Sequence, residues 1–149
     1  MLFIAAQNVD PFSFSTQTWT HITGISQAIS LTSSSKVLVS VSSMASGASG
    51  IMYRIDRGGT VIGTGTAAGS RPLVTWGATD GLGGQNAESV SFEWLDTHGT
   101  SGSVTYKIQV RCQTTNPAAV HFLNRQVTDS DNSFYPRGVT VMTLTEIGA

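Results

Sequence analysis

Two stretches of the chain, residues 36–44 and 104–111, alternate between apolar and polar side chains. In the first, Val37, Val39 and Val41 share one face; in the second, Tyr106 and Ile108 belong to the apolar face. A repeat of two residues is typical of a β-strand with one buried face, because successive side chains point to opposite sides. Such strands are stable when the apolar faces of two sheets pack together, so the pattern predicts a layered β protein.

Other segments fit the same architecture. Residues 89–95 place Val90, Phe92 and Trp94 on one face, and we expect this segment and residues 104–111 to form the strongest strand pair. The predicted core residues of these strands, chosen because they occupy the apolar faces, are Val39, Phe92, Trp94, Tyr106 and Ile108.

Turn signals separate these segments. Gly58 and Gly59 stand between two β-prone runs and predict a two-residue hairpin turn, with Ile55 opposite Ile62. Residues 121–147 indicate a strand, a polar loop and a second strand that belongs to the fold. Helical periodicity is missing from the sequence. We therefore predict one all-β domain over residues 1–149, a β-sandwich of jelly-roll topology with about eight or more antiparallel strands and minimal helix.

The N-terminal segment, residues 1–15, shows no clear period but contains Phe3, Phe12 and Phe14. These rings either cover the core of their own subunit or dock on a partner, and we take the segment as a candidate docking arm. The start of the chain lacks a basic region and Asp10-Pro11 interrupts the apolar run, so we expect synthesis and folding in a cytoplasm.

Composition excludes several classes of partner. The net charge is −1 and only 11% of residues are charged, so neither nucleic acid nor an anionic membrane is an expected partner. Cys112 is the single cysteine, which rules out an intrachain disulfide and predicts a small buried thiol.

Candidate chemical motifs are weak. The glycine loop at residues 63–69 is followed by another strand and not by a helix, which argues against a phosphate site. Residues 129–133 offer alternating oxygen ligands but lack the glycine and glutamate of a calcium loop. The three histidines lack metal-ligand spacing, and Cys112 has no assigned base. We expect no enzyme, no cofactor and no metal. The Trp and Tyr side chains could stack on sugars but suit a core equally well.

One part of the sequence resembles a known family. The matching segments are 92–100, 104–111, 122–125, 137–138 and 143–147, together with Asp129 and Asp131. They are similar to a β-rich domain of tailed-phage virion proteins, which occurs in capsid decoration (cement) proteins and in tail-fibre tips. The resemblance implies that the matching polar positions form a structural motif or ion-pair network: Asp96, Asn124, Arg125, Asp129, Asp131, Arg137 and Glu146. Arg125 and Arg137 bracket the acidic loop and could pair with it within one subunit or between neighbours.

The same resemblance implies a function. We expect a non-enzymatic structural protein on the capsid surface of a virion, a homotrimer that binds the major capsid protein and stabilises the shell. The alternative is a tail-fibre tip that recognises a host-surface glycan or protein. A fibre tip normally follows a shaft, whereas only about 15 residues precede the first predicted strand here, and this favours the decoration protein.

Overall fold

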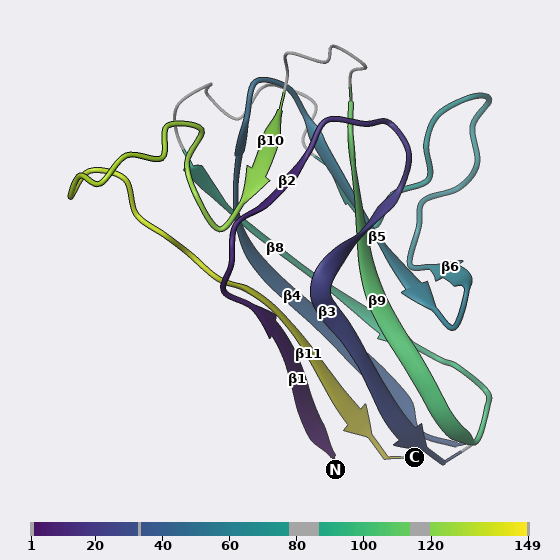
Figure 1. Cartoon of the computed structure of the whole chain (residues 1–149). Helices are drawn as coiled ribbons and strands as arrows, with labels where there is room; N and C mark the ends of the chain where they lie inside the picture. Colours follow the sequence, from purple (N-terminus) through teal and green to yellow (C-terminus); the bar gives the residue numbers. More distant parts are fainter. Residues whose placement is uncertain (1, 33, 78–86, 114–119, 149) are drawn as a thin grey trace.

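The computed structural model describes residues 2–32, 34–77, 87–113 and 120–148. Within these ranges the chain forms strands and no helix, arranged as two antiparallel sheets that pack face to face (Figure 1). The strands are β1 (Phe3–Asn8), β2 (Phe12–Phe14), β3 (Thr20–Leu31), β4 (Lys36–Gly47), β5 (Ile51–Arg57), β6 (Thr60–Ile62), β7 (Trp76–Gly77), β8 (Ala87–Asp96), β9 (Gly102–Cys112), β10 (His121–Leu123) and β11 (Thr140–Ile147).

Sheet A contains β1, β2, β4, β8, β10 and β11. One edge of β4 pairs with β8, so β10 and β11 both use its other edge, one after the other. β2 pairs with β10 and β1 pairs with β11 in the same way. Sheet A therefore has the strand positions β1/β2, β11/β10, β4 and β8, two of which are interrupted by a loop.

Sheet B has the order β3, β9, β5, β6, and β7 continues the position of β6 along the same edge of β5. Counted by strand position, with β1/β2, β6/β7 and β10/β11 each taken as one, the chain crosses between the sheets at every connection except that from β5 to β6. This connectivity, four positions in each sheet, is that of a jelly roll, and the predicted fold class is confirmed. One expected pairing is wrong: β8 pairs with β4, and β9 pairs with β3 and β5.

The local predictions around the glycine turn are confirmed. Gly58 and Gly59 have φ values of 57° and 92°, which a side chain disfavours and glycine permits. The register pairs Ile55 with Ile62 and Arg57 with Thr60, as the sequence predicts. At the other end of the chain, β10, a loop and β11 follow one another, and β11 lies between β1 and β4.

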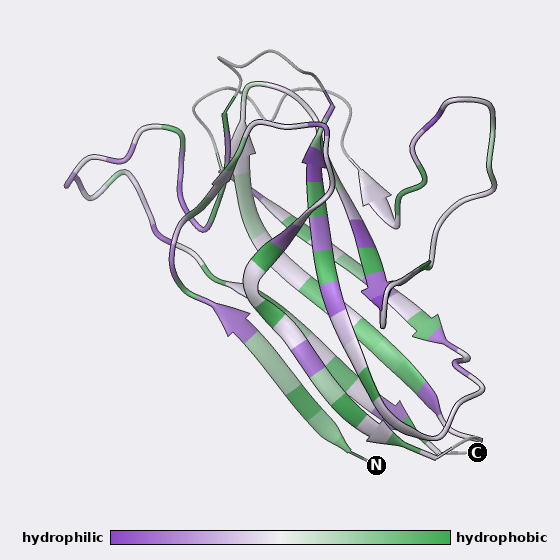
Figure 2. Cartoon of the chain, turned by 45° about the vertical axis from the view of Figure 1, so that its right-hand side comes forward, coloured by the Kyte–Doolittle hydropathy of each residue, from purple (hydrophilic) through white to green (hydrophobic). Residues whose placement is uncertain are grey.

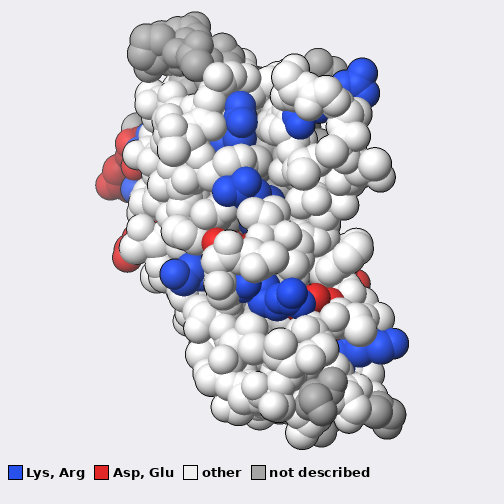
Figure 3. All heavy atoms as spheres, turned by 90° about the vertical axis from the view of Figure 1, so that its right-hand side faces the viewer, with Lys and Arg blue, Asp and Glu red and all other residues white. Residues whose placement is uncertain are grey.

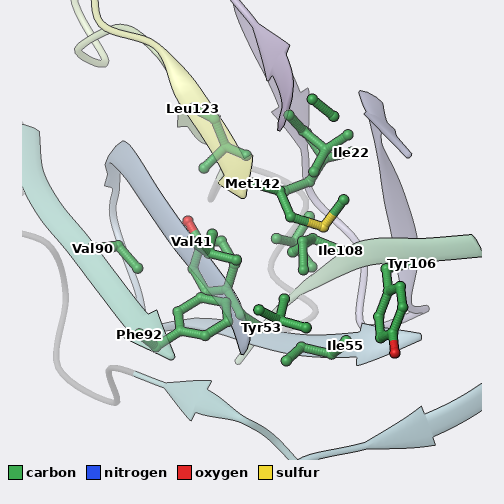
Figure 4. Close-up of a cluster of buried hydrophobic side chains, with 14 of the residues drawn as sticks. Ile22, Val41, Tyr53, Ile55, Val90, Phe92, Tyr106, Ile108, Leu123 and Met142 are labelled. Atoms are coloured by element: carbon green, nitrogen blue, oxygen red, sulfur yellow. The ribbon is translucent and has the colours of Figure 1, made fainter. Parts of the chain in front are cut away.

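The core lies between the sheets. Apolar and polar residues alternate along the strands (Figure 2), and the apolar ones meet in one cluster that includes Tyr53, Val41 and Met142 (Figure 4). Four of the predicted core residues are buried there: Val39, Phe92, Tyr106 and Ile108.

The prediction for Trp94 is wrong, because its side chain is 40% exposed. Trp94 lies two residues after Phe92 on β8, so both side chains are on the face that points toward sheet B. The opposing edge of sheet B is formed by β6, which is only three residues long and cannot cover the indole. Beyond β6 the indole is met by Gly63, where an added Cβ would lie 2.8 Å from the ring. The ring is thus covered on one side by backbone and open to solvent on the other.

Candidate functional site

The N-terminal segment is not a free arm. β1 runs along β11 and β2 along β10, so both are members of sheet A. Phe14 is buried and stacks on the His121 ring, with ring centroids 5.6 Å apart, and Phe12 packs against the core. Docking through all three phenylalanines is therefore wrong: pairing with strands near the C-terminus turns two of the rings inward. Phe3, which is 66% exposed, still faces solvent.

Phe3 belongs to an apolar row on the outer face of sheet A. The strand registers place Phe3 opposite Thr145, Thr145 opposite Leu38, and Leu38 opposite Leu95. Leu95 is 45% exposed and Leu38 is half-buried. We call these four residues the sheet A row. The row crosses the full width of the sheet, and three of its four side chains are apolar.

The surroundings of the sheet A row carry little charge. On the same outer face, the row of paired residues next to the sheet A row consists of Ala5, Thr143, Ser40 and Glu93. The Glu93 carboxylate accepts a hydrogen bond from the Ser40 hydroxyl at 2.7 Å, which partly satisfies it. The polar groups of this face are mostly neutral hydroxyls. Removing water from such a face costs less free energy than removing water from a face rich in ionised groups.

The loop between β10 and β11 is fixed at its neck by Asn124, which is fully buried and has a φ of 67°. Its amide Nδ2 donates to the carbonyl oxygens of Asn8 and Asp10, each at 2.9 Å, and its Oδ1 accepts from the Thr140 hydroxyl at 2.8 Å. Its carbonyl also accepts from the Gly138 N–H at 2.9 Å. Asn124 therefore closes the loop and ties it to β1 and β11.

The predicted pairing within this loop is present in a single subunit. The Asp129 carboxylate lies 3.0 Å from Arg125 and 2.7 Å from Arg137. The Arg125 guanidinium also covers the Phe122 ring at 3.9 Å, and its Nη2 donates to the Val127 carbonyl at 2.9 Å. One carboxylate thus holds both ends of the loop together, and an arginine anchors it on β10.

Asp131 belongs to the same loop but lies at a cavity of about 260 Å³ that Asp129, Tyr135 and Arg137 also line. The loop projects away from the sandwich (Figure 1), and Phe134 is 81% exposed on it. Phe134 is not among the site residues predicted from the sequence, although an apolar ring within a polar loop is visible there.

Asp96 and Glu146, the other polar residues of the predicted ion-pair network, have partners outside the loop. Asp96 is buried at the end of β8, where it accepts a hydrogen bond from the Tyr106 hydroxyl at 2.7 Å and pairs with Arg57 at 2.9 Å. Burial, and then this bond to Asp96, raise the pKa of Tyr106. Glu146 lies near Thr32 and Ser35 instead; the Ser35 side chain and then the Thr32 N–H lower its pKa. The predicted set therefore divides into separate groups.

Cys112 has a histidine neighbour that the sequence did not reveal. Its sulfur lies 3.1 Å from His121 Nδ1, and His121 Nε2 lies 2.9 Å from the Ser49 hydroxyl. Gly47 makes room for the imidazole, since a Cβ there would lie 2.3 Å from the ring. Cys112 and His121 are both fully buried, and burial raises the pKa of the thiol to about 11. The thiol and the imidazole lie within hydrogen-bond distance inside the core, where burial disfavours the thiolate.

The described residues contain no cluster of three or more His, Cys, Asp or Glu side chains that could hold a metal ion. In the same part of the chain, no helix has the length and apolar character needed to cross a membrane.

Comparison with known proteins assigns no family to this chain. No protein-family model matches the chain, and no curated protein matches it. Among solved structures, the insecticidal delta-endotoxin Cry8Ea1 from Bacillus thuringiensis is similar over 93% of this chain, with 18% identity and a TM-score of 0.45. The chain spans only 20% of that protein's length, and a likeness this low carries no argument about function. The protein is a jelly-roll β-sandwich.

Proposed function

We propose that this protein is a non-enzymatic structural component of a tailed-phage virion, a capsid decoration protein that acts as a homotrimer. The observation that carries the proposal is the sheet A row, a largely apolar strip across a weakly charged sheet face. The phage setting is supported by the resemblance of residues 92–147, whose Asn124, Arg125, Asp129 and Arg137 meet in one loop.

The sheet A row is the proposed contact between copies. Phe3 and Leu95 are large apolar side chains that remain exposed in one subunit, and their burial would stabilise an assembly by about 1–2 kcal/mol per side chain. Closed cyclic symmetry buries such a strip without producing an open polymer. The described surface also has few charges to hold copies apart, because only 11% of all residues are charged.

Light scattering of the purified protein tests this assembly. The wild type should have the mass of a trimer, and the double variant Phe3→Ser/Leu95→Ser should dissociate to monomers that keep a cooperative thermal transition. A matched control is Leu73→Ser/Phe134→Ser, which makes the same chemical changes at exposed residues outside the sheets. The control should remain a trimer.

Two results would contradict the assembly: a wild-type monomer at micromolar concentration, or equal dissociation of both double variants. The shell partner is tested separately. The trimeric protein should bind to undecorated capsids of its phage and raise the temperature at which these capsids rupture. If it does not bind, the decoration role is refuted even when the protein is a trimer.

The alternative is a tail-fibre tip that binds a receptor on the host surface. The projecting loop with Phe134 at 81% exposure favours it, because an exposed aromatic ring on a braced loop is suited to insertion into a partner. Phe134→Ser should then reduce adsorption of the phage to its host, and it should leave adsorption unchanged if the protein only decorates the capsid.

A further inference from the structure

The outer face of sheet B, on the opposite side of the sandwich from the sheet A row, contains two arginines on one indole. The Arg54 guanidinium carbon lies 4.3 Å from the Trp19 ring centroid, and that of Arg111 lies 5.6 Å from the same centroid. Arg54 comes from β5 and Arg111 from β9, which pair as neighbouring strands. Trp19 directly precedes β3, so three strand positions bring the cluster together.

Neither of these two arginines forms an ion pair among the described residues. The ion pairs of the described residues join Arg57 to Asp96, and Arg125 and Arg137 to Asp129; none involves Arg54 or Arg111. Burial lowers the pKa of Arg54. The Asp56 carboxylate on the same strand raises this pKa, and the Arg111 charge, whose influence is smaller than that of Asp56, lowers it. Two half-buried like charges on one ring raise the free energy of the empty surface, and an anion bound there would lower it.

The guanidinium groups retain free donors. Arg54 uses Nε to donate to Gln109 Oε1 at 2.6 Å, and Arg111 uses Nε to donate to its neighbouring Cys112 carbonyl at 3.3 Å. No bond from an Nη atom of either residue is made to the described part of the chain. Terminal guanidinium N–H pairs fit the two oxygens of a carboxylate, so this cluster is oriented to accept one.

Neutral polar groups lie beside the charges. Gln109 Nε2 lies 3.2 Å from His21 Nε2, and both side chains belong to the outer face of sheet B, in one row with Arg54. An amide and an imidazole are suited to hydroxyl groups, and the indole offers an apolar edge or face to a sugar ring. Figure 3, seen from the side of β5 and β6, shows Lys and Arg side chains along this face with few acidic ones.

The surroundings distinguish between kinds of anionic partner. A protein interface needs an apolar centre, yet the described exposed hydrophobic side chains include none from β3, β5 or β9. A nucleic acid needs a larger basic excess than a chain of net charge −1 provides. An acidic polysaccharide carries carboxylates on hydroxyl-rich sugar rings. Its carboxylates fit the arginines of this face, and its hydroxyl groups fit the neutral polar side chains.

From this arrangement we propose that Trp19, Arg54, Gln109, His21 and Arg111 form a binding site for a carboxylate-bearing sugar unit of an acidic polysaccharide. The site goes beyond the capsid role and does not depend on it. If copies meet through sheet A, sheet B faces outward, and three sites in one assembly would bind a polymer with higher avidity than one site does.

The test measures binding of the purified protein to polygalacturonate, hyaluronate and polysialic acid by calorimetry, with neutral dextran as a blank. Arg54→Gln and Arg111→Gln should each weaken binding to at least one of these polymers by about tenfold. Arg71→Gln, which removes the same charge from an exposed loop residue, should leave the affinity within about twofold of the wild type. The Phe3→Ser/Leu95→Ser variant separates this site from the proposed assembly, because its monomer should keep the affinity of a single site.

Three outcomes would overturn the proposal. The first is failure of every acidic polysaccharide to bind. The second is an equal loss of affinity in Arg71→Gln and Arg111→Gln, which would mean that net charge alone acts. The third is tighter binding of polyglutamate or duplex DNA than of any polysaccharide, with the same dependence on Arg54 and Arg111, which would mean that the site takes an anion of another class.

Discussion

Replacement of Asn124 tests whether this residue closes the loop between β10 and β11. Asn124→Ala removes the hydrogen bonds to the Asn8 and Asp10 carbonyls and the bond from the Thr140 hydroxyl. A net loss of about 1 kcal/mol per bond gives about 3 kcal/mol. The φ of 67° adds about 1 kcal/mol, because alanine tolerates this region less well than asparagine does. The expected loss in the free energy of unfolding is therefore about 4 kcal/mol.

Two further substitutions separate these contributions. Asn124→Gly also lacks the side-chain bonds but accepts the positive φ, so it should be less destabilising than alanine by about 1 kcal/mol. Asn124→Asp keeps the acceptor for Thr140 but places a buried oxygen against two carbonyl oxygens 2.9 Å away. Its deficit at neutral pH should therefore shrink as the pH falls and the carboxyl gains a proton.

Urea unfolding followed by tryptophan fluorescence, at one fixed protein concentration, measures all three variants. Asn132→Ala is the matched control, because Asn132 is an exposed asparagine of the same loop whose side chain accepts one hydrogen bond from the Phe134 N–H. The control should lose less than about 1 kcal/mol. An equally small loss for Asn124→Ala would refute the closing role, and alanine and glycine variants of equal stability would refute the backbone part of the reasoning.

Three other predictions concern the stability of the fold. Trp94→Ala should cost about 2 kcal/mol and Phe92→Ala about 3–5 kcal/mol in urea unfolding, because Trp94 is 40% exposed and Phe92 is 8% exposed; the reverse order would mean that the indole is buried. Gly63→Ala should destabilise the fold by about 1–3 kcal/mol, since φ is 65° and the added Cβ would lie 2.8 Å from the Trp94 ring; an unchanged thermal midpoint would argue against this contact. The Cys112 thiol, whose pKa rises to about 11 on folding, contributes stability that is complete below its ordinary pKa of 9.0 and is lost as pH rises through 11. The free energy of unfolding of the wild type should therefore fall relative to that of Cys112→Ala between pH 8 and pH 10.5. A constant difference between the two proteins would contradict the raised pKa of the thiol.

The sequence was informative wherever the determinants of structure are local. Alternation in residues 36–44 and 104–111 predicted β4 and β9, since the side-chain period of a strand is a property of the segment alone. The Gly58-Gly59 turn predicted the register of β5 and β6 for the same reason. The jelly roll followed from the number of strands and the turns between them.

Contacts between distant segments were not readable from local patterns. The position β10/β11 is one strand interrupted by a loop, and the pairing of both halves with one edge of β4 shows that they are in line. Phe14 and Phe12 turn inward because β2 pairs with β10, more than 100 residues away in sequence.

The same limit applies to the surface clusters. Arg125, Asp129 and Arg137 lie close in sequence and could be grouped beforehand. Trp19, Arg54 and Arg111 could not, because they meet only through the order of strands in sheet B. Trp94 has the periodicity of a core residue, and its exposure is set by the shortness of β6 on the facing sheet.

Electron cryomicroscopy of phage particles locates this chain directly if the proposed decoration role is correct. A trimeric decoration protein should give density for three copies at each occupied position on the capsid surface, with Phe3 and Leu95 buried between neighbouring copies and Trp19 facing outward. Density for this chain at the end of a tail fibre, or a capsid-bound form whose copies do not touch through the sheet A row, would contradict this proposal.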